Sequence, residues 1–222
     1  MATTVHEPPE AKPHPTLSDD GGWHDLTPST GNLLAVDDSS PASRTGIWVA
    51  LAAITMTFAA ITSAMVVRQG ASLDWRHFTL PPVLYLNTAL LLASSVTLEL
   101  ARKGVASFSR GVQPGRSRPL GWLCVTLGLG LLFVGGQYTA WLQLKAEGWY
   151  LATNPSSSFF YLFTAMHGLH VLGGLVGLTM VIWRFSRPVS TLRLSTLSTV
   201  SYYWHFMDVL WIYLLLLLWT RI

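Results

Sequence analysis

Five long apolar runs, separated by short polar links, constrain this chain more than any other feature. The runs cover residues 47–67, 83–101, 120–142, 159–183 and 200–220. Each is close to the length of about 20 residues that an α-helix needs to cross the hydrocarbon core of a bilayer. The pattern therefore predicts an all-α membrane protein, in which residues 46–222 form a bundle of five transmembrane helices.

The composition supports a membrane protein and excludes two other classes. Half of the 222 residues are hydrophobic and only 11% are charged, whereas soluble domains carry about 25% charged residues. The single cysteine, Cys124, excludes an internal disulfide framework. The net charge of +3 comes from basic residues scattered among the links. Because they form no basic stripe, nucleic acid is excluded as a partner.

Residues 1–45 differ in composition from the rest of the chain. Pro, Ser, Thr and Asp dominate there, and no periodic apolar pattern is present. Such a segment cannot bury enough apolar surface to offset the conformational entropy that folding removes. We therefore expect a disordered tail before the membrane domain.

The distribution of Lys and Arg predicts the orientation of the helices. Five helices place the tail and the second and fourth links on one side of the membrane, and these segments hold ten Lys and Arg residues. The opposite side holds four, which are Arg68, Arg76, Lys145 and Arg221. The N-terminus is therefore expected in the cytoplasm and the C-terminus outside.

A few polar residues lie inside or next to the apolar runs and are the candidates for function. They are Glu99, Arg102, Gln137, His167, His170, His205 and Asp208. A charge in mid-membrane costs roughly 2.5–3.5 kcal/mol on insertion scales, so Asp208 requires a partner or a role. His205 and Asp208 are three residues apart and share one helix face.

Two arrangements of the acidic residues are open. In the first, Glu99, His205 and Asp208 form a polar cluster that faces a neighbouring helix, a lipid headgroup or trapped water. In the second, Glu99 pairs with Arg102, three residues later, at the membrane interface. We expect the remaining candidates to be polar helix-packing residues; these are Gln137, His167 and His170.

The spacing of the histidines argues against a haem b site. A haem held by two histidines needs ligands at one level on different helices. A rise of about 1.5 Å per residue places His170 and His205 about 12 Å apart along the membrane normal. The chain also shows no discontinuous helices or inverted repeats, which disfavours a free-standing transporter. No metal site is expected in this chain.

Three segments carry a resemblance to a known family. Residues 203–211 read YWHFMDVLW, residues 167–174 read HGLHVLGG, and residues 86–101 read LNTALLLASSVTLELA. Together they resemble the cytochrome c oxidase subunit III family, in a short five-helix bacterial form. The resemblance covers residues 45–222 in order and leaves the tail uncovered.

The resemblance implies a function and a setting. Subunits of this family pack beside the catalytic subunit I of a respiratory haem-copper oxidase, with subunit II, in the bacterial inner membrane. The chain is then a component of a proton-pumping oxidoreductase without a catalytic site of its own, and haem and copper are expected only in partner subunits. Implied roles are stabilising subunit I, sustaining proton uptake and admitting oxygen. Bound phospholipid, cytochrome c and a respiratory supercomplex are further implied partners.

Under this resemblance, Glu99, Arg102, His205 and Asp208 are candidates for lipid contact or a proton antenna. Two positions depart from the family pattern. Ile54 and Ala140 stand where related chains often carry a buried pair of glutamates, so any function of that pair is in doubt here. Replacing both glutamates together would avoid leaving one of them buried in the bundle without its partner.

Two alternatives to the cytochrome c oxidase interpretation are open. The same scaffold could serve a quinol oxidase or a nitric oxide reductase, which differ in the chemistry of the partner enzyme. A free-standing transporter or haem-b protein is the alternative from another class, and it predicts a mid-membrane cavity or haem absorbance.

Overall fold

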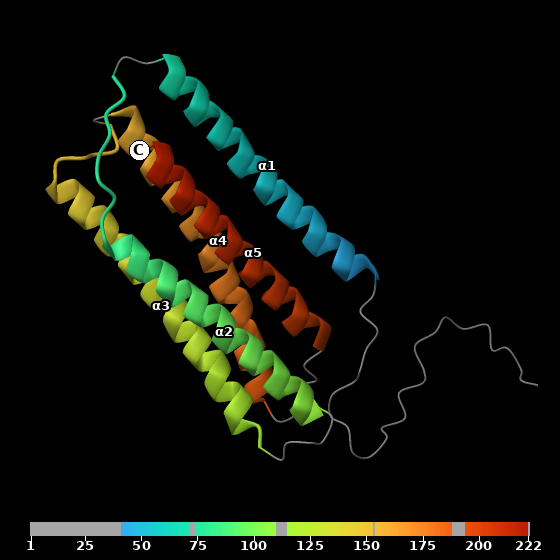
Figure 1. The fold of residues 1–222 in the computed structure, drawn as a ribbon. Helices are drawn as coiled ribbons and strands as arrows, with labels where there is room; N and C mark the ends of the chain where they lie inside the picture. The colour runs from blue at the N-terminus through green and yellow to red at the C-terminus, as the bar shows by residue number, and fades with distance from the viewer. Residues whose placement is uncertain (1–40, 72–73, 110–114, 153, 188–193, 222) are drawn as a thin grey trace, which may run out of the picture. The chain divides into compact units, whose positions relative to one another are not determined.

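A computed structural model describes residues 41–71, 74–109, 115–152, 154–187 and 194–221. These residues form five α-helices (Figure 1), which are α1 (Pro41–Ala71), α2 (Val83–Ser109), α3 (Ser117–Ala146), α4 (Pro155–Ser186) and α5 (Leu194–Arg221). The expected tail lies outside the described residues up to residue 40, while residues 41–45 already belong to α1.

All five helices are long and apolar enough to cross a membrane, which confirms the predicted fold class. Each helix extends beyond the apolar run that predicted it. The largest extension is at the end of α2, which continues from residue 101 to Ser109. The next are at the starts of α1 and α5, which begin at Pro41 rather than residue 47 and at Leu194 rather than residue 200. The apolar run corresponds only to the part of each helix that lies in the hydrocarbon core of the membrane. The helix continues past it because its backbone N–H and C=O groups need partners at the interface as well.

Prolines and an asparagine set the starts of two helices. The N–H of Leu84 donates to the carbonyl of Pro81 over 3.1 Å, so the residues before α2 already form its first turn. Pro155 occupies the first position of α4, where its missing N–H costs nothing, and Asn154 precedes it with an extended backbone. The side chain of Asn154 makes no capping hydrogen bond.

Helices α2, α3, α4 and α5 form a closed ring of neighbours, with α2 and α3 in the most extensive contact. Among the described helices, α1 approaches α4 and α5. Glycines permit the closest approaches within the ring. A Cβ atom on Gly136 would overlap the amide of Asn87 on α2, and one on Gly130 would lie 2.7 Å from Leu175 on α4 and 2.9 Å from Trp204 on α5.

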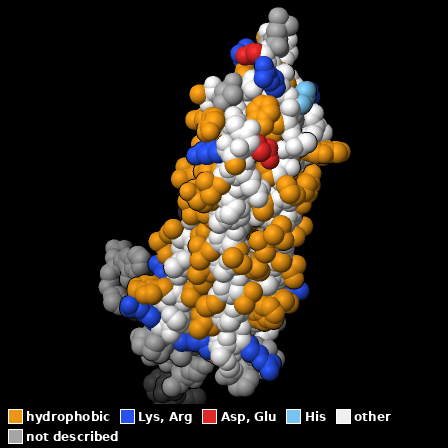
Figure 2. All heavy atoms as spheres, turned by 90° about the vertical axis from the view of Figure 1, so that its left-hand side faces the viewer, with side chains coloured by type: hydrophobic (Ala, Val, Ile, Leu, Met, Phe, Trp, Pro, Cys, Tyr) orange, Lys and Arg blue, Asp and Glu red, His pale blue; other side chains and the backbone are white. Residues whose placement is uncertain are grey.

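The outer surface of the helices is apolar over most of its length. Figure 2 shows one face, on which hydrophobic side chains cover the middle while Lys and Arg gather toward the two ends. Large apolar side chains such as Met56, Leu169 and Trp219 are more than half exposed. Because lipid tails are as apolar as leucine, such exposure suits a membrane and not water.

Candidate functional site

The contact between α2 and α5 holds a chain of three polar side chains. Ser95 on α2 donates a hydrogen bond to Oδ2 of Asp208 on α5, and its oxygen lies 2.8 Å from Nδ1 of His205. A hydroxyl has one hydrogen to donate. With that hydrogen on Asp208, Nδ1 of His205 is the donor to Ser95. The result is a directed chain from His205 through Ser95 to Asp208.

The two ends of this chain of hydrogen bonds have different surroundings: the Asp208 end is buried, and the His205 end is open. Asp208 is only 5% exposed, and its Oδ1 atom has no hydrogen-bond partner among the described residues. The ring of His205 is half-exposed at the edge of the bundle. Its Nδ1 atom lies 4.0 Å from Oδ2 of Asp208, too far for a direct hydrogen bond. Ser95 therefore bridges the two groups.

Two tryptophans fix α2 against α5 on either side of this chain. Nε1 of Trp204 donates to the hydroxyl of Ser94 over 2.9 Å. One helical turn beyond Asp208, Nε1 of Trp211 donates to the hydroxyl of Thr88 over 3.0 Å. Both indoles are buried, so each N–H needs such a partner. These bonds hold Ser95 in register with its partners on α5.

Glu99 and Arg102 form an ion pair on α2. The carboxylate accepts a hydrogen bond from Nη2 of Arg102 over 3.1 Å, and its other oxygen lies 3.0 Å from Nε; both side chains are about one-third exposed. This is the second of the two arrangements that the sequence leaves open. In the first arrangement Glu99 was expected beside His205 and Asp208, whereas in the structure it is Ser95 that contacts both of these residues. The i, i+3 spacing favours the local pair because both side chains lie on one face of the same helix.

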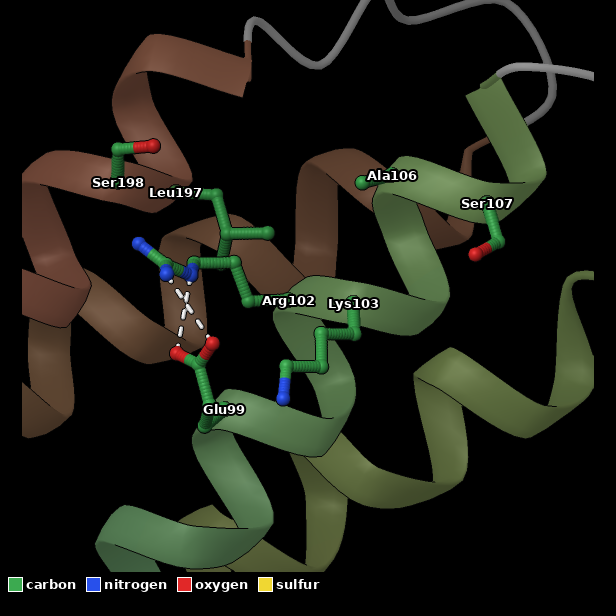
Figure 3. A pocket seen from close by; sticks show the side chains of 7 residues that line it. All are labelled: Glu99, Arg102, Lys103, Ala106, Ser107, Leu197 and Ser198. Carbon is green, nitrogen blue, oxygen red and sulfur yellow. Dashed lines mark hydrogen bonds and ion pairs between the residues drawn. The ribbon is translucent and has the colours of Figure 1, made fainter.

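The ion pair lines a groove at the end of α2 and the beginning of α5 (Figure 3). The groove has a volume of about 570 Å³. Its lining residues are Glu99, Arg102, Lys103, Ala106, Ser107, Leu197 and Ser198. Helix geometry places Glu99 about 15 Å and His205 about 17 Å from the ends of their helices on this side. These two candidate residues therefore lie at nearly one level.

The histidines of α4 are not part of this site. His167 is fully buried between the rings of Phe133 and Trp211, at centroid distances of 5.8 and 5.0 Å. Neither of its ring nitrogens has a hydrogen-bond partner among the described residues. Nδ1 of His170 bonds the carbonyl of Met166 on its own helix over 2.6 Å. No group of three or more metal-ligating side chains occurs in the described part of the chain.

Gln137 joins α3 to α2. Its Oε1 atom accepts a hydrogen bond from Nδ2 of Asn87 over 3.2 Å, and both residues are buried. Its own Nε2 atom has no partner among the described residues. Gln137 therefore lies at a helix contact, at the point where Gly136 allows α2 to approach closely.

The two positions that depart from the family pattern lie in the bundle core. Ile54 on α1 and Ala140 on α3 are both buried. Within the described residues the backbones of these two helices make no close approach: α1 approaches α4 and α5, and α3 approaches α2 and α4.

Sequence reasoning missed the hydroxyl side chains of α2. Thr88, Ser94 and Ser95 each bond a side chain of α5. A signal was present, because Thr88 and Ser95 are seven residues apart and share one helix face. Serine and threonine bond across helices in membranes, but they are also frequent at positions without such a bond, so the sequence does not single them out.

These contacts define the class of the protein: an integral-membrane helical bundle whose buried polar side chains bond helix to helix. The chain belongs to the cytochrome c oxidase subunit III family. The sequence model of that family, described as "Cytochrome c oxidase subunit III", matches residues 47–221. The match spans all five helices and confirms the resemblance carried by the sequence motifs.

Named relatives agree with the family. A "Probable cytochrome c oxidase subunit 3" of Mycobacterium leprae is 40% identical over 126 residues, which are 56% of this chain and 59% of the relative. A "Cytochrome c oxidase subunit 3" of Thermostichus vulcanus is 31% identical over 199 residues, covering 86% of this chain and 94% of the relative. One of Corynebacterium diphtheriae is 36% identical over 137 residues, covering 61% and 63%. The alignment thus covers about three fifths of the mycobacterial relative and nearly all of the Thermostichus one.

Proposed function

We propose that this protein is an accessory subunit of a respiratory haem-copper cytochrome c oxidase and carries no redox centre of its own. One observation carries the proposal: the family match runs through all five helices, and the relatives are named as cytochrome c oxidase subunit 3. In this proposal the chain lies in the bacterial inner membrane beside the catalytic subunit I and subunit II. It stabilises subunit I during aerobic electron transport.

The α2–α5 site suggests how the subunit would assist proton uptake. The chain of hydrogen bonds from His205 through Ser95 to Asp208 leads from the edge of the bundle to a buried carboxyl group. Proton relays in membrane proteins use His and Asp in this way. We place this site toward the cytoplasmic side, where an oxidase takes up protons.

The orientation in this proposal follows from the basic residues at the two ends of the helices. One end holds six described cations, which are Arg102, Lys103, Arg116, Arg118, Arg184 and Arg187. The other end holds four, which are Arg68, Arg76, Lys145 and Arg221. Because Lys and Arg are in excess at the first end, we assign that end to the cytoplasm and the C-terminus to the outside. Bound phospholipid along the exposed apolar surface and a path for oxygen through it complete the proposal.

Purification from the native membrane in a mild detergent tests the proposal. A tagged chain should retain a larger haem-copper subunit in a fixed ratio, together with the haem absorbance of that partner. Oxygen consumption by the purified complex with reduced cytochrome c, compared with a quinol, then tests the electron donor. Recovery of the chain only as a free homodimer, with no haem protein attached, would show that the proposal is wrong.

A further inference from the structure

A second groove lies between α3 and α4, on the exposed apolar surface of the bundle and apart from the α2–α5 site. We call it the α3–α4 groove, and it is open where Tyr138, Leu169 and Leu172 are exposed. Its volume of about 280 Å³ is just below the range of about 300–1,000 Å³ that is typical of small-molecule sites. The groove therefore has room for a ring system but not for a whole membrane lipid.

The α3–α4 groove contains the side-chain amide of Gln137, which is only 5% exposed. The Oε1 atom of this amide accepts a hydrogen bond from Asn87. Its Nε2 atom, which carries two hydrogens, has no partner among the described residues. Because an unpaired donor is costly where no water is present, a bound molecule that supplies an acceptor is favoured at this point.

The depth of Gln137 narrows the source of that acceptor. Gln137 lies five residues, or about 8 Å, inside the end of the apolar run 120–142. The polar groups of phospholipids lie outside the hydrocarbon core, and an acyl chain within the core carries no acceptor. The described lining of the groove contains no charged side chain. These features favour an uncharged molecule that brings a carbonyl oxygen into the hydrocarbon.

Aromatic side chains at both ends of the α3–α4 groove suit a flat ring. Phe133 is held by edge-to-face contacts with His167 and Trp211, at centroid distances of 5.8 and 5.1 Å. At the other end, Nε1 of Trp141 donates to the hydroxyl of Thr164 over 3.0 Å, which fixes this indole across the two helices. Aromatic rings pack well against each other in offset or edge-to-face geometry. The groove thus presents two fixed aromatic side chains to a planar ligand.

An apolar track continues from the groove along α4. Leu169, Leu172, Val176 and Met180 follow each other at spacings of three, four and four residues, so they lie along one face of the helix. All four side chains are exposed. A long hydrocarbon chain attached to a ring in the groove would cover this track.

From these observations we propose that the α3–α4 groove binds an isoprenoid quinone. The ring occupies the groove, one carbonyl oxygen accepts a hydrogen bond from Nε2 of Gln137, and the prenyl chain lies along α4. The quinone is a bound ligand here, and the proposal includes no electron transfer within this chain. It goes beyond the proposed function and does not depend on which enzyme the subunit joins.

Photolabelling of the full-length chain, purified with any partners it retains and placed in phosphatidylcholine nanodiscs, tests the proposal. The probe is an azide-substituted menadione, a naphthoquinone without a prenyl chain, and labelled peptides are identified by mass spectrometry. Label is expected on residues 133–141 and 164–172. Unlabelled menadione should compete with the probe. Methylnaphthalene has the same rings without carbonyl oxygens, so it should compete about tenfold less well.

Two pairs of variants locate the site. A Cβ atom at Gly168 meets nothing within 4 Å, so Gly168→Leu should fold, fill the groove and lower labelling about tenfold. Gly128→Leu, at an equally open glycine that does not line the groove, is the matched control. Gln137→Met removes the donor at similar volume and should weaken binding about fivefold. Asn87→Leu breaks the bond to Gln137 but leaves its amide in place, and should bind as the unchanged protein does.

Label on both segments that falls in Gly168→Leu and Gln137→Met, but in neither control, supports the proposal. Label that is equal in all four variants reports only partition of the probe into the bilayer and would overturn it. Loss of label in Gly168→Leu alone, with methylnaphthalene competing as well as menadione, would overturn the assignment to a quinone. No label on either segment would also overturn it and would favour a partner helix as the occupant. Retention of a haem-copper partner in the same preparation reports separately on the proposed function.

Discussion

The contact between α2 and α3 is close enough that one methyl group should disrupt it. A Cβ atom at Gly136 would lie 2.8 Å from Cγ and 3.0 Å from Nδ2 of Asn87, and nearer still to Oδ1. Asn87 is only 1% exposed and donates to Gln137 over 3.2 Å. Its amide therefore cannot move aside into solvent without losing that hydrogen bond. Gly136→Ala is the perturbation that tests this contact.

The magnitude follows from three contributions. Leaving a buried amide without its partner costs about 1–3 kcal/mol. Inserting a methyl group into a well-packed contact costs a further 1–3 kcal/mol or so. Replacing glycine by alanine in a helix returns roughly 1 kcal/mol. We therefore expect Gly136→Ala to lower the free energy of unfolding by roughly 1–5 kcal/mol.

The neighbouring glycine supplies a matched control. A Cβ atom at Gly135 meets nothing within 4 Å, so Gly135→Ala should leave stability unchanged or raise it. Both variants would be unfolded in detergent micelles by heating and by titration with denaturing detergent, followed by circular dichroism. Adding Asn87→Ala to Gly136→Ala should relieve the overlap and recover part of the loss. If the Gly136→Ala variant is as stable as the Gly135→Ala variant, the conclusion that α2 packs closely on α3 at Gly136 is wrong.

Two further predictions concern the contact between α2 and α5. Trp211→Phe removes the donor to Thr88 and should cost about 1–3 kcal/mol of stability, whereas the exposed Trp219→Phe should be neutral; equal effects in the same thermal unfolding assay would contradict this. Asp208→Asn keeps an acceptor for Ser95 but removes a charge whose burial costs about 2.5–3.5 kcal/mol, so the isolated chain should become as stable or more stable. Under the proposed function the same substitution should shorten the time for which the oxidase sustains turnover, and unchanged endurance would leave the carboxyl group a packing residue.

Much of the fold could be predicted because hydrophobic length alone dictates it. A run of apolar residues such as 159–183 has no stable alternative to a helix in lipid, where each unpaired backbone group is costly. The helix ends were less accessible to prediction. Residues 102–109 of α2 are polar enough for a link, yet they continue the helix and bring Lys103 and Ser107 into the groove.

The candidate site was predictable only in part. Asp208 and His205 drew attention because charge and imidazole are costly in lipid, and the structure places both at one contact. Ser95, which joins them, is a small side chain whose partner is 110 residues away along the chain. From the sequence, Glu99 could pair with Arg102 on its own helix or lie beside His205 and Asp208 on another helix. The structure pairs it with Arg102.

The sequence by itself determined five membrane-spanning helices, the residues that cannot be left unpaired in lipid, and the family motifs at 167–174 and 203–211. Only the tertiary structure decided which helices are neighbours, and hence that Ser95 bridges His205 to Asp208. The physical reason is that a segment spans the membrane when it is long and apolar enough, and this depends only on its local composition. Hydrogen bonds act over about 3 Å and depend on how whole helices rotate and pack.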